Sequence, residues 1–258
     1  MLELRIEKLL EFVKAAVDRS DPDGKERSPE VQARFNRIME KYILSSTHPN
    51  IKEFNEEYHS LPEKDKMDLA KQMGNIDRKV FGDRYPQEYF ANNSYDILDS
   101  LDLEEEPYGF YMHTKDDPKK ICGYIYGSNG LNHIDEEEID GLKEVLTSLD
   151  IDNIDGIIAD LRSGKVFYVE NLATTSECGT GLMPSGALLM VELVKKLRDS
   201  SNFVYIFADF LSDSYEIIKA AKSSNIFGQL GAEIILDVNN IFDDGDIYPR
   251  SKILIKIK

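Results

Sequence analysis

The sequence predicts an α/β fold of the mixed (α+β) kind, in which helices flank a sheet and a helical region precedes it. Two observations predict it. Residues 1–104 carry only helical patterns, whereas short apolar runs typical of strands alternate with amphipathic helices from residue 105 onward. We therefore expect a helical N-terminal region over residues 1–104 and a second domain, built on the sheet, over residues 105–258.

The helices of the first region are indicated by their start and stop signals. Apolar residues recur at helical spacing over residues 2–17 and end at the turn sequence DPDG. A second helix is expected over residues 28–44, with Ser28 as its N-cap. Shorter helices are expected over residues 48–61 and 61–73, each beginning near a proline, and no stretch has the period of a strand.

The second region opens with a predicted β-hairpin, because the β-rich runs YGFYMHT and KICGYIYGS flank the turn sequence KDDPKK. Helices and strands alternate after it. We expect helices over residues 135–149, 186–198 and 212–227, and strands over residues 165–174, 202–210, 231–238 and 251–258.

The net charge of the chain narrows the classes of partner that it is expected to bind. The 258 residues include 31 basic and 48 acidic side chains, a net charge of −17. Nucleic acids and anionic membranes bind clustered Lys and Arg, so we expect neither as a direct partner, whereas an acidic surface suits a basic protein partner. The amphipathic N-terminal segment is unlike a signal peptide, and no apolar run reaches the roughly 18 residues of a membrane span. Together these two observations predict a cytoplasmic protein.

Cysteine and histidine usage predicts neither a disulfide scaffold nor a metal site. Cys122 and Cys178 are the only cysteines, and a chain of this size does not need a disulfide, so reduced thiols are favoured over one bridge. Cys178 is a weak candidate nucleophile, since no histidine is near it in sequence. The four histidines have no metal-ligand spacing, and the acidic runs are typical of helix starts and solvated faces.

One strand-loop-helix connection, VFYVENLATTSECGTGLMPSGALLMVELVKKL, has the composition of a phosphate-binding loop. Its glycines allow the backbone to approach a ligand, and the first N–H groups of the following helix have no partner within the helix. From this pattern alone, a plain connector remains the favoured alternative. The helix is expected to face the sheet through Ala187, Met190, Val191, Val194 and Leu197.

The order of these elements resembles the GNAT family of acyl-CoA-dependent N-acetyltransferases over about residues 107–258. The likeness rests on the segments VFYVENLAT, GTGLMPSGALLM, FVYIFADF and FGQLGAEIIL. It implies a mostly antiparallel mixed sheet, acetyl-CoA as co-substrate without a metal, and an amine or protein as acceptor. Two positions depart from the family pattern. Ser176 or Thr180, depending on the register, replaces the Gln/Arg of the pyrophosphate motif, and Phe227 replaces a tyrosine that serves as general acid.

The resemblance also implies which residues bind acetyl-CoA. The backbone at the end of the central strand would polarise the thioester carbonyl, and the loop and helix start would hold the pyrophosphate. The implied binding residues are Leu172, Ala173, Thr174, Gly179, Thr180, Gly181, Ser185 and Gly186.

Acyl transfer to an amine also needs a base, and an acid for the departing thiolate. Glu170 is the candidate base, because an acid is unusual in a strand on the same face as Val166, Tyr168 and Leu172. The alternative is a solvent-facing or lysine-paired acid. Tyr215 is the candidate acid, with packing as its alternative, and Tyr168 is a possible replacement that is more typical of a core.

Three functions remain open from the sequence. The first is a GNAT-like N-acetyltransferase. The second is a catalytically degenerate GNAT-like fold, from a phage or another source, that serves as a structural or protein-interaction module. The third is an α/β domain unrelated to acyl-CoA. An open region between the central strand and the next one would favour the enzyme.

Overall fold

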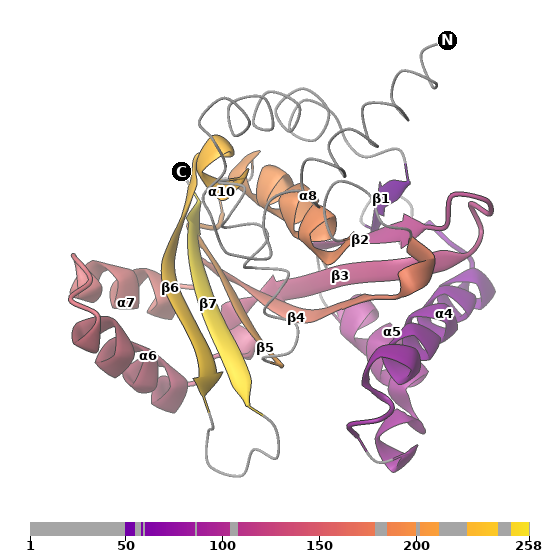
Figure 1. Cartoon of the computed structure of the whole chain (residues 1–258), viewed down its shortest axis with the longest axis horizontal. Coiled ribbons are helices and arrows are strands. Elements are labelled where there is room, and N and C mark those ends of the chain that lie inside the picture. The colour runs from indigo at the N-terminus through magenta and orange to yellow at the C-terminus, as the bar shows by residue number, and fades with distance from the viewer. Residues whose placement is uncertain are drawn as a thin grey trace, which may run out of the picture.

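A computed structural model describes residues 50–54, 58, 60–85, 87–103, 108–178, 185–199, 202–211, 226–241 and 249–257. The predicted helices over residues 2–17 and 28–44, and most of the one over 212–227, lie outside these ranges. The described chain forms one mixed sheet with helices on both faces (Figure 1).

The sheet has seven strands in the order β1-β2-β3-β4-β5-β7-β6. Every neighbouring pair is antiparallel except β4 and β5, which are parallel. The predicted mixed, mostly antiparallel sheet is confirmed. The strands are β1 (Ile51–Glu53), β2 (Tyr108–His113), β3 (Ile121–Asn129), β4 (Val166–Thr174), β5 (Tyr205–Leu211), β6 (Ala232–Ile241) and β7 (Arg250–Ile257).

β1 corrects the expectation of a helix over residues 48–61. It is only three residues long, and it joins the sheet by pairing with β2. No two-residue period can be read from so short a strand, whose place is fixed by its neighbour rather than by its own pattern. The sheet therefore begins within the region that the sequence assigned to helices.

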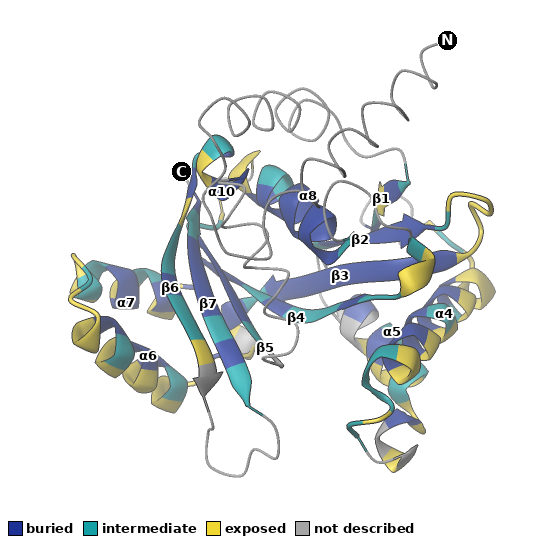
Figure 2. Ribbon diagram, viewed as in Figure 1, coloured by how far each residue is buried: buried dark blue, intermediate teal, exposed yellow. Residues whose placement is uncertain are grey.

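Helices cover the two faces of the sheet differently. The largest apolar core lies between the sheet and α8. A second core joins α4 and α5 to β2 and β3, and a third joins α6 and α7 to β4, β5, β6 and β7 (Figures 1 and 2). The α-helices of the described residues are α4 (Glu63–Phe81), α5 (Asn93–Leu103), α6 (Glu136–Ser148), α7 (Ile154–Arg162), α8 (Ser185–Asp199) and α10 (Ile226–Gln229).

The helix predicted over residues 186–198 is confirmed as α8, but it is more deeply buried than its pattern indicated. The predicted face, which includes Ala187 and Val191, is buried, and so are Leu188, Leu189 and Leu193 outside it. A helix that is apolar all round is one that the protein buries all round.

A β-bulge interrupts the pairing of β3 with β4. Tyr126 pairs with Asn171 and Gly127 pairs with Val169, so Glu170 is the extra residue on β4. A bulge reverses the alternation of side chains along its strand. Phe167 and Val169 lie in the core with α8 before the bulge.

The alternation is reversed after the bulge. Leu172 packs against that same core, and Ala173 belongs to the core on the opposite face. This corrects the expectation that Leu172 shares a face with Glu170. The bulge instead brings two consecutive residues, Glu170 and Asn171, onto the face opposite α8.

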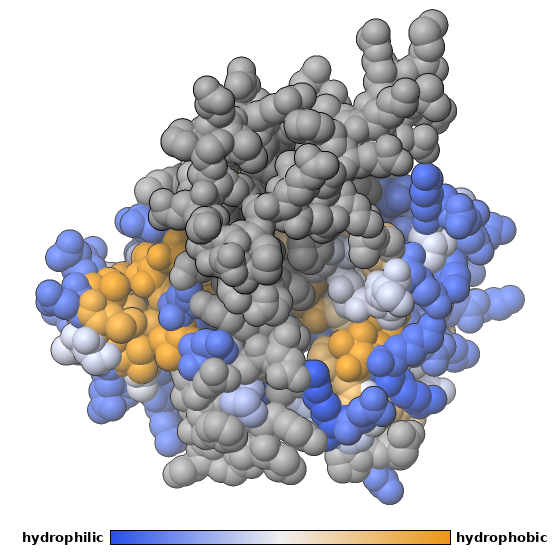
Figure 3. Space-filling view, viewed as in Figure 1, coloured by the Kyte–Doolittle hydropathy of each residue, from blue (hydrophilic) through white to orange (hydrophobic). Residues whose placement is uncertain are grey.

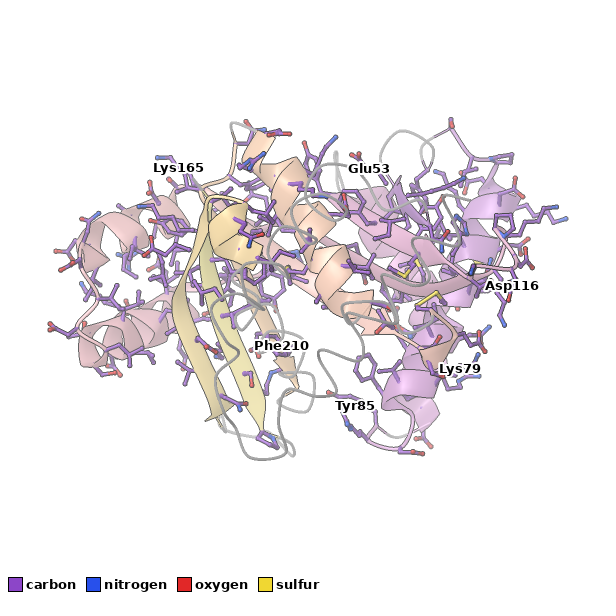
Figure 4. All side chains as sticks on the ribbon, turned by 45° about the horizontal axis from the view of Figure 1, so that its top comes forward. Glu53, Lys79, Tyr85, Asp116, Lys165 and Phe210 are labelled. Atoms are coloured by element: carbon purple, nitrogen blue, oxygen red, sulfur yellow. A yellow bond between two sulfur atoms is a disulfide. The ribbon has the colours of Figure 1, made fainter. Side chains whose placement is uncertain are left out.

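The two cysteines are joined as a disulfide, in contrast to the expected thiols (Figure 4). Thr174 pairs with Gly123, which brings Cys178 next to Cys122 on β3 with their Cα atoms 5.1 Å apart. That separation is typical of a disulfide. The bridge therefore ties the end of β4 to its neighbouring strand.

Candidate functional site

The two parallel strands at the centre of the sheet separate along their length. β4 pairs with β5 from Val166 to Val169, and within the described residues this pairing does not continue. Both strands go on beyond it, since β4 pairs with β3 as far as Thr174 and β5 pairs with β7 as far as Leu211. Figure 1 shows β4 and β5 diverging. The backbone of β4 that follows Val169 therefore borders the region between the diverging strands.

The direction of the backbone groups on β4 follows from one hydrogen bond. Thr175 N–H donates to the Cys122 carbonyl on β3, at 2.8 Å. Successive residues of a strand direct their N–H groups to opposite sides, so Ala173 also faces β3, and Leu172 and Thr174 face the diverging β5. Of the two residues predicted to polarise a carbonyl, Thr174 therefore directs its N–H toward the region between the diverging strands, whereas Ala173 does not; Leu172, predicted only to bind acetyl-CoA, directs its N–H there as well.

Glu170 lies where the two strands separate, and its side chain is 14% exposed. Ser128 Oγ on β3 donates a hydrogen bond to Glu170 Oε1 at 2.8 Å. Ser128 Oγ also lies 2.7 Å from His133 Nε2, and that nitrogen is 3.4 Å from Glu170 Oε1. A hydroxyl has one hydrogen, so the serine that donates to Glu170 accepts its second bond from His133.

This trio differs from a serine hydrolase triad. In such a triad the carboxylate binds the histidine nitrogen farther from the serine, and the hydroxyl faces the substrate. Here Glu170 binds the serine hydroxyl itself, and Ser128 is only 1% exposed. The arrangement orients a carboxylate and does not present a serine nucleophile.

Tyr168 packs against His133 and has a strongly perturbed hydroxyl. The two rings are stacked, with centroids 5.0 Å apart and an interplanar angle of 11°. Burial raises the pKa of Tyr168 to about 12, and the negative charges of Asp209 and Glu138 add to this. The hydroxyl therefore keeps its proton at neutral pH and is a poor source of protons there.

Charged side chains from three elements border this cluster on the side of β5 and β7. Asp209 on β5 accepts a 2.7 Å hydrogen bond from Arg250 Nε, and Lys252 Nζ lies 3.9 Å from its other oxygen. Lys252 also approaches Glu138 on α6, at 3.5 Å. Burial raises the pKa of Glu138, an effect that Lys252 partly offsets. Two carboxylates and two cations thus face each other beside Tyr168.

A second polar network begins at Asn171, the neighbour of Glu170. Asp77 on α4 is 3% exposed and accepts hydrogen bonds from Tyr124, from Asn93 at 2.9 Å and from Asn171 at 3.3 Å. Burial raises the pKa of Asp77 more than these hydrogen bonds lower it. The network joins α4 and α5 to β3 and β4.

The other predicted site residues are only partly described. Ser185 and Gly186 form the first turn of α8. Phe227 is buried in α10, within the core that contains α8. Gly179, Thr180, Gly181 and Tyr215 lie outside the described residues. The sequence did not predict Ser128, His133 or Asp77 as site residues. Their only signal is that each is a polar residue within an apolar pattern.

In the described part of the chain, no group of three or more His, Cys, Asp and Glu side chains is placed to hold a metal ion. None of the helices described there is long and apolar enough to span a membrane. Figure 3 shows hydrophilic residues over the α4 side of the molecule and an apolar area near α7.

Comparisons with known proteins give structural matches only, since no protein-family model and no curated protein matches the sequence. NAA60 of Arabidopsis thaliana in complex with acetyl-CoA is 12% identical, with 80% of this chain and 97% of that chain covered and a TM-score of 0.44. A ribosomal-protein-alanine N-acetyltransferase of Brucella melitensis is 11% identical, with 81% and 99% covered and a TM-score of 0.43. The aminoglycoside N-acetyltransferase AAC(6')-Ib11 is 15% identical, with 81% and 96% covered and a TM-score of 0.43.

TM-scores below 0.5 are too low to assign a fold by themselves. The assignment rests on the element order that the sequence led us to expect, on the single parallel pair in an otherwise antiparallel sheet, and on the divergence of that pair. The fold is GNAT-like. α6 is the helix predicted over residues 135–149, whereas α7, which follows it between β3 and β4, was not predicted.

Proposed function

We propose that this protein is a GNAT-like N-acetyltransferase that transfers the acetyl group of acetyl-CoA to an amine. The observation that carries the proposal is the position of Glu170, a carboxylate with little exposure where β4 and β5 separate. A base must lie next to the place where the thioester carbonyl and the amine meet, and this gap offers backbone N–H donors on the same strand.

Each step of the reaction has a candidate group. Glu170 takes a proton from the acceptor ammonium, and the freed amine attacks the thioester carbonyl. The carbonyl oxygen accepts a hydrogen bond from the N–H of Leu172 or Thr174, which favours these two over Ala173. The departing thiolate takes a proton from Tyr215, in keeping with its implied role as general acid. Tyr168 holds its proton too tightly to replace it.

The pyrophosphate of acetyl-CoA is assigned to the loop and the start of α8. The N–H groups of Ser185 and Gly186 lie in the first turn of that helix, where the helix dipole favours an anion. The preceding loop supplies Gly179, Thr180 and Gly181 to the same role. The acceptor is an amine or a protein amino group, and nothing among the described residues favours the alternative of a degenerate module.

The first test is calorimetric titration with acetyl-CoA. Gly181→Glu places a negative charge in the proposed pyrophosphate loop, so we expect its binding to be at least 100-fold weaker than the micromolar binding of the wild type. Gly141→Glu is the matched control, because Gly141 is an exposed residue of α6 with nothing near its Cβ position. No heat at millimolar acetyl-CoA, or equal loss in both variants, would contradict the assignment.

The second test addresses catalysis. Glu170→Gln keeps the size of the side chain and removes the base. We expect kcat/KM for an amine found by screening amino acids, polyamines and peptides to fall about 100- to 10,000-fold. The Kd for acetyl-CoA should not change. A variant that keeps the wild-type rate would rule out Glu170 as the base.

A further inference from the structure

If Glu170 takes a proton in each turnover, as the proposed function requires, that proton must leave before the next cycle. The Glu170 side chain is only 14% exposed, so direct exchange with bulk water is restricted. We propose that Ser128 and His133 form a proton relay that returns Glu170 to the carboxylate form. The inference rests on the proposed function and adds two positioning residues that act through Glu170.

The contacts form an ordered chain from the interior to the surface. Glu170 Oε1 and Ser128 Oγ are 2.8 Å apart, and Ser128 Oγ and His133 Nε2 are 2.7 Å apart. Both separations are within hydrogen-bond range, which proton transfer requires. Ser128 is 1% exposed, whereas the His133 side chain is 27% exposed. The ring of His133 is thus the member of the chain most accessible to water.

The transfer conserves protons at each atom. Protonated Glu170 donates its Oε1–H to Ser128 Oγ, and Ser128 passes its own hydroxyl hydrogen to His133 Nε2. The Oε1–H and Ser O–H bonds break as a new Ser O–H bond and an Nε2–H bond form. Glu170 is then a carboxylate, Ser128 is again a hydroxyl, and His133 is an imidazolium that releases a proton to water.

The two contacts fit the state that follows this transfer. Ionised Glu170 can only accept a hydrogen bond, so Ser128 then donates its one hydrogen to Glu170 and accepts from His133 Nε2. The ring of Tyr168 is stacked on His133, with ring centroids 5.0 Å apart, and holds the imidazole in this orientation. Imidazole is the side-chain group whose ordinary titration range includes neutral pH.

Among the described residues, the charged side chains near the relay lie on α6, β5 and β7. Glu138 on α6 and Asp209 on β5 are carboxylates next to Tyr168, and Arg250 and Lys252 on β7 are cations that pair with them. Glu170 Oε1 lies 3.4 Å from His133 Nε2, so a change of charge on one of these two groups acts on the other.

The test measures His133→Ala, Ser128→Ala and wild type with the amine accepted by the wild type. We expect kcat to fall about 10- to 100-fold in both variants, with KM for acetyl-CoA unchanged. Imidazole at about 50 mM should restore most of the rate of His133→Ala by replacing the missing proton acceptor at the surface. It should not restore Ser128→Ala, in which the buried link is missing.

The pH dependence supplies a readout that a merely structural role would not change. Glu170→Gln removes the charge beside His133, so the NMR titration midpoint of the His133 ring should fall by about 0.5 to 1 pH unit. The ring of His113 lies elsewhere in the sheet and serves as the internal control. Loss of catalysis in His133→Ala that imidazole does not restore, with an unchanged His133 titration in Glu170→Gln, would overturn the relay.

The two proposals fail in different ways. A wild type that transfers acetyl groups, depends on Glu170 and is unaffected by His133→Ala would overturn the relay alone. A wild type without acetyl transfer to any amine would overturn the proposed function, and the relay with it.

Discussion

Glu170 and Asn171 are neighbours on β4, yet they join two different kinds of polar network. Asn171 contacts Asp77, which is 3% exposed and receives hydrogen bonds from three side chains. Glu170 is 14% exposed and contacts Ser128, which leads to a partly exposed histidine. One network is enclosed between helices and sheet, and the other reaches the surface.

The difference teaches how to separate a structural carboxylate from a reactive one. A buried carboxylate with all its hydrogen bonds made holds elements together, and removing it leaves unpaired partners. A carboxylate beside an open strand edge, with a route for its proton, can exchange protons during a reaction. We therefore expect substitution of Asp77 to affect stability and substitution of Glu170 to affect rate.

The largest effect is expected for Asp77→Ala. Tyr124, Asn93 and Asn171 would each lose a hydrogen-bond acceptor inside the protein. The free energy of unfolding should fall by about 3 kcal/mol. Urea denaturation measures it, with Glu170→Gln as the comparison, expected to lose under about 1 kcal/mol. Equal losses in the two variants would show that Asp77 and Glu170 contribute alike to stability, which would contradict the distinction drawn between them.

The pH dependence of the free energy of unfolding gives a second test of the buried Asp77. Burial raises the folded-state pKa of Asp77 above 3.8, so the stabilisation by the protonated form is complete below pH 3.8 and is lost as the pH rises through the raised pKa. The Asp77→Asn variant has no titratable side chain at this position. Wild-type stability relative to this variant should thus decline above pH 3.8, by at most about 1.4 kcal/mol per pH unit. A difference in the free energy of unfolding between wild type and Asp77→Asn that stays constant with pH would contradict this prediction.

Removal of the disulfide is expected to have an effect of similar size. It closes a sequence separation of 56 residues at the end of β4, on the Asn171 side of the bulge. Replacing both Cys122 and Cys178 with alanine should lower the free energy of unfolding by about 3 kcal/mol, and a reducing agent should then have no further effect. If the wild type unfolds at the same urea concentration with and without dithiothreitol, the bridge contributes nothing.

Gly127→Ala tests the boundary between the two networks. A Cβ atom at this position, which faces the bulge, would overlap the carbonyl oxygen of Tyr168. We expect a loss of about 2 kcal/mol in stability together with a changed NMR signal of the His133 ring. Gly141→Ala on the exposed side of α6 is the control and should be neutral or slightly stabilising. An unperturbed His133 signal in Gly127→Ala would show that the bulge does not set the site.

The smallest effect is expected at Glu177. Hydrogen bonds from Lys120 and, to a lesser degree, Lys79 lower the pKa of Glu177, but this carboxylate lies at the surface, where ion pairs are screened (Figure 4). Glu177→Gln should leave the urea midpoint within experimental error, at low and at high salt. A clear shift would mean that surface pairs contribute as much as the enclosed network.

Much of the fold was predictable because its longer elements repeat a period. The helix over residues 186–198, the hairpin and the closing strand β7 all show one, and all are confirmed. β1 is too short to show a period, and α7 follows a left-handed N-cap, Asn153, whose side chain makes no capping hydrogen bond. Such elements are determined by the neighbours they pack against.

Glu170 could be found from sequence because an acid among apolar strand residues is conspicuous. Its bulge could not be found, since no glycine or proline on β4 marks it, and the change of face after it went unpredicted for Leu172. His133 is separated from Glu170 in sequence by two helices, and it approaches Glu170 beside Ser128 on the neighbouring strand. Contacts of this kind arise from strand register and leave no local pattern.

The α6–α7 pair has a consequence for where the members of the proposed relay lie in the chain. Antiparallel neighbours such as β3 and β4 need only a short turn between them, so the sheet does not require the helices inserted there. His133 lies at the start of that insertion, whereas Ser128 and Glu170 belong to the strands. The outermost member of the proposed relay therefore lies on the segment inserted between the two strands, whereas its two inner members belong to the sheet itself.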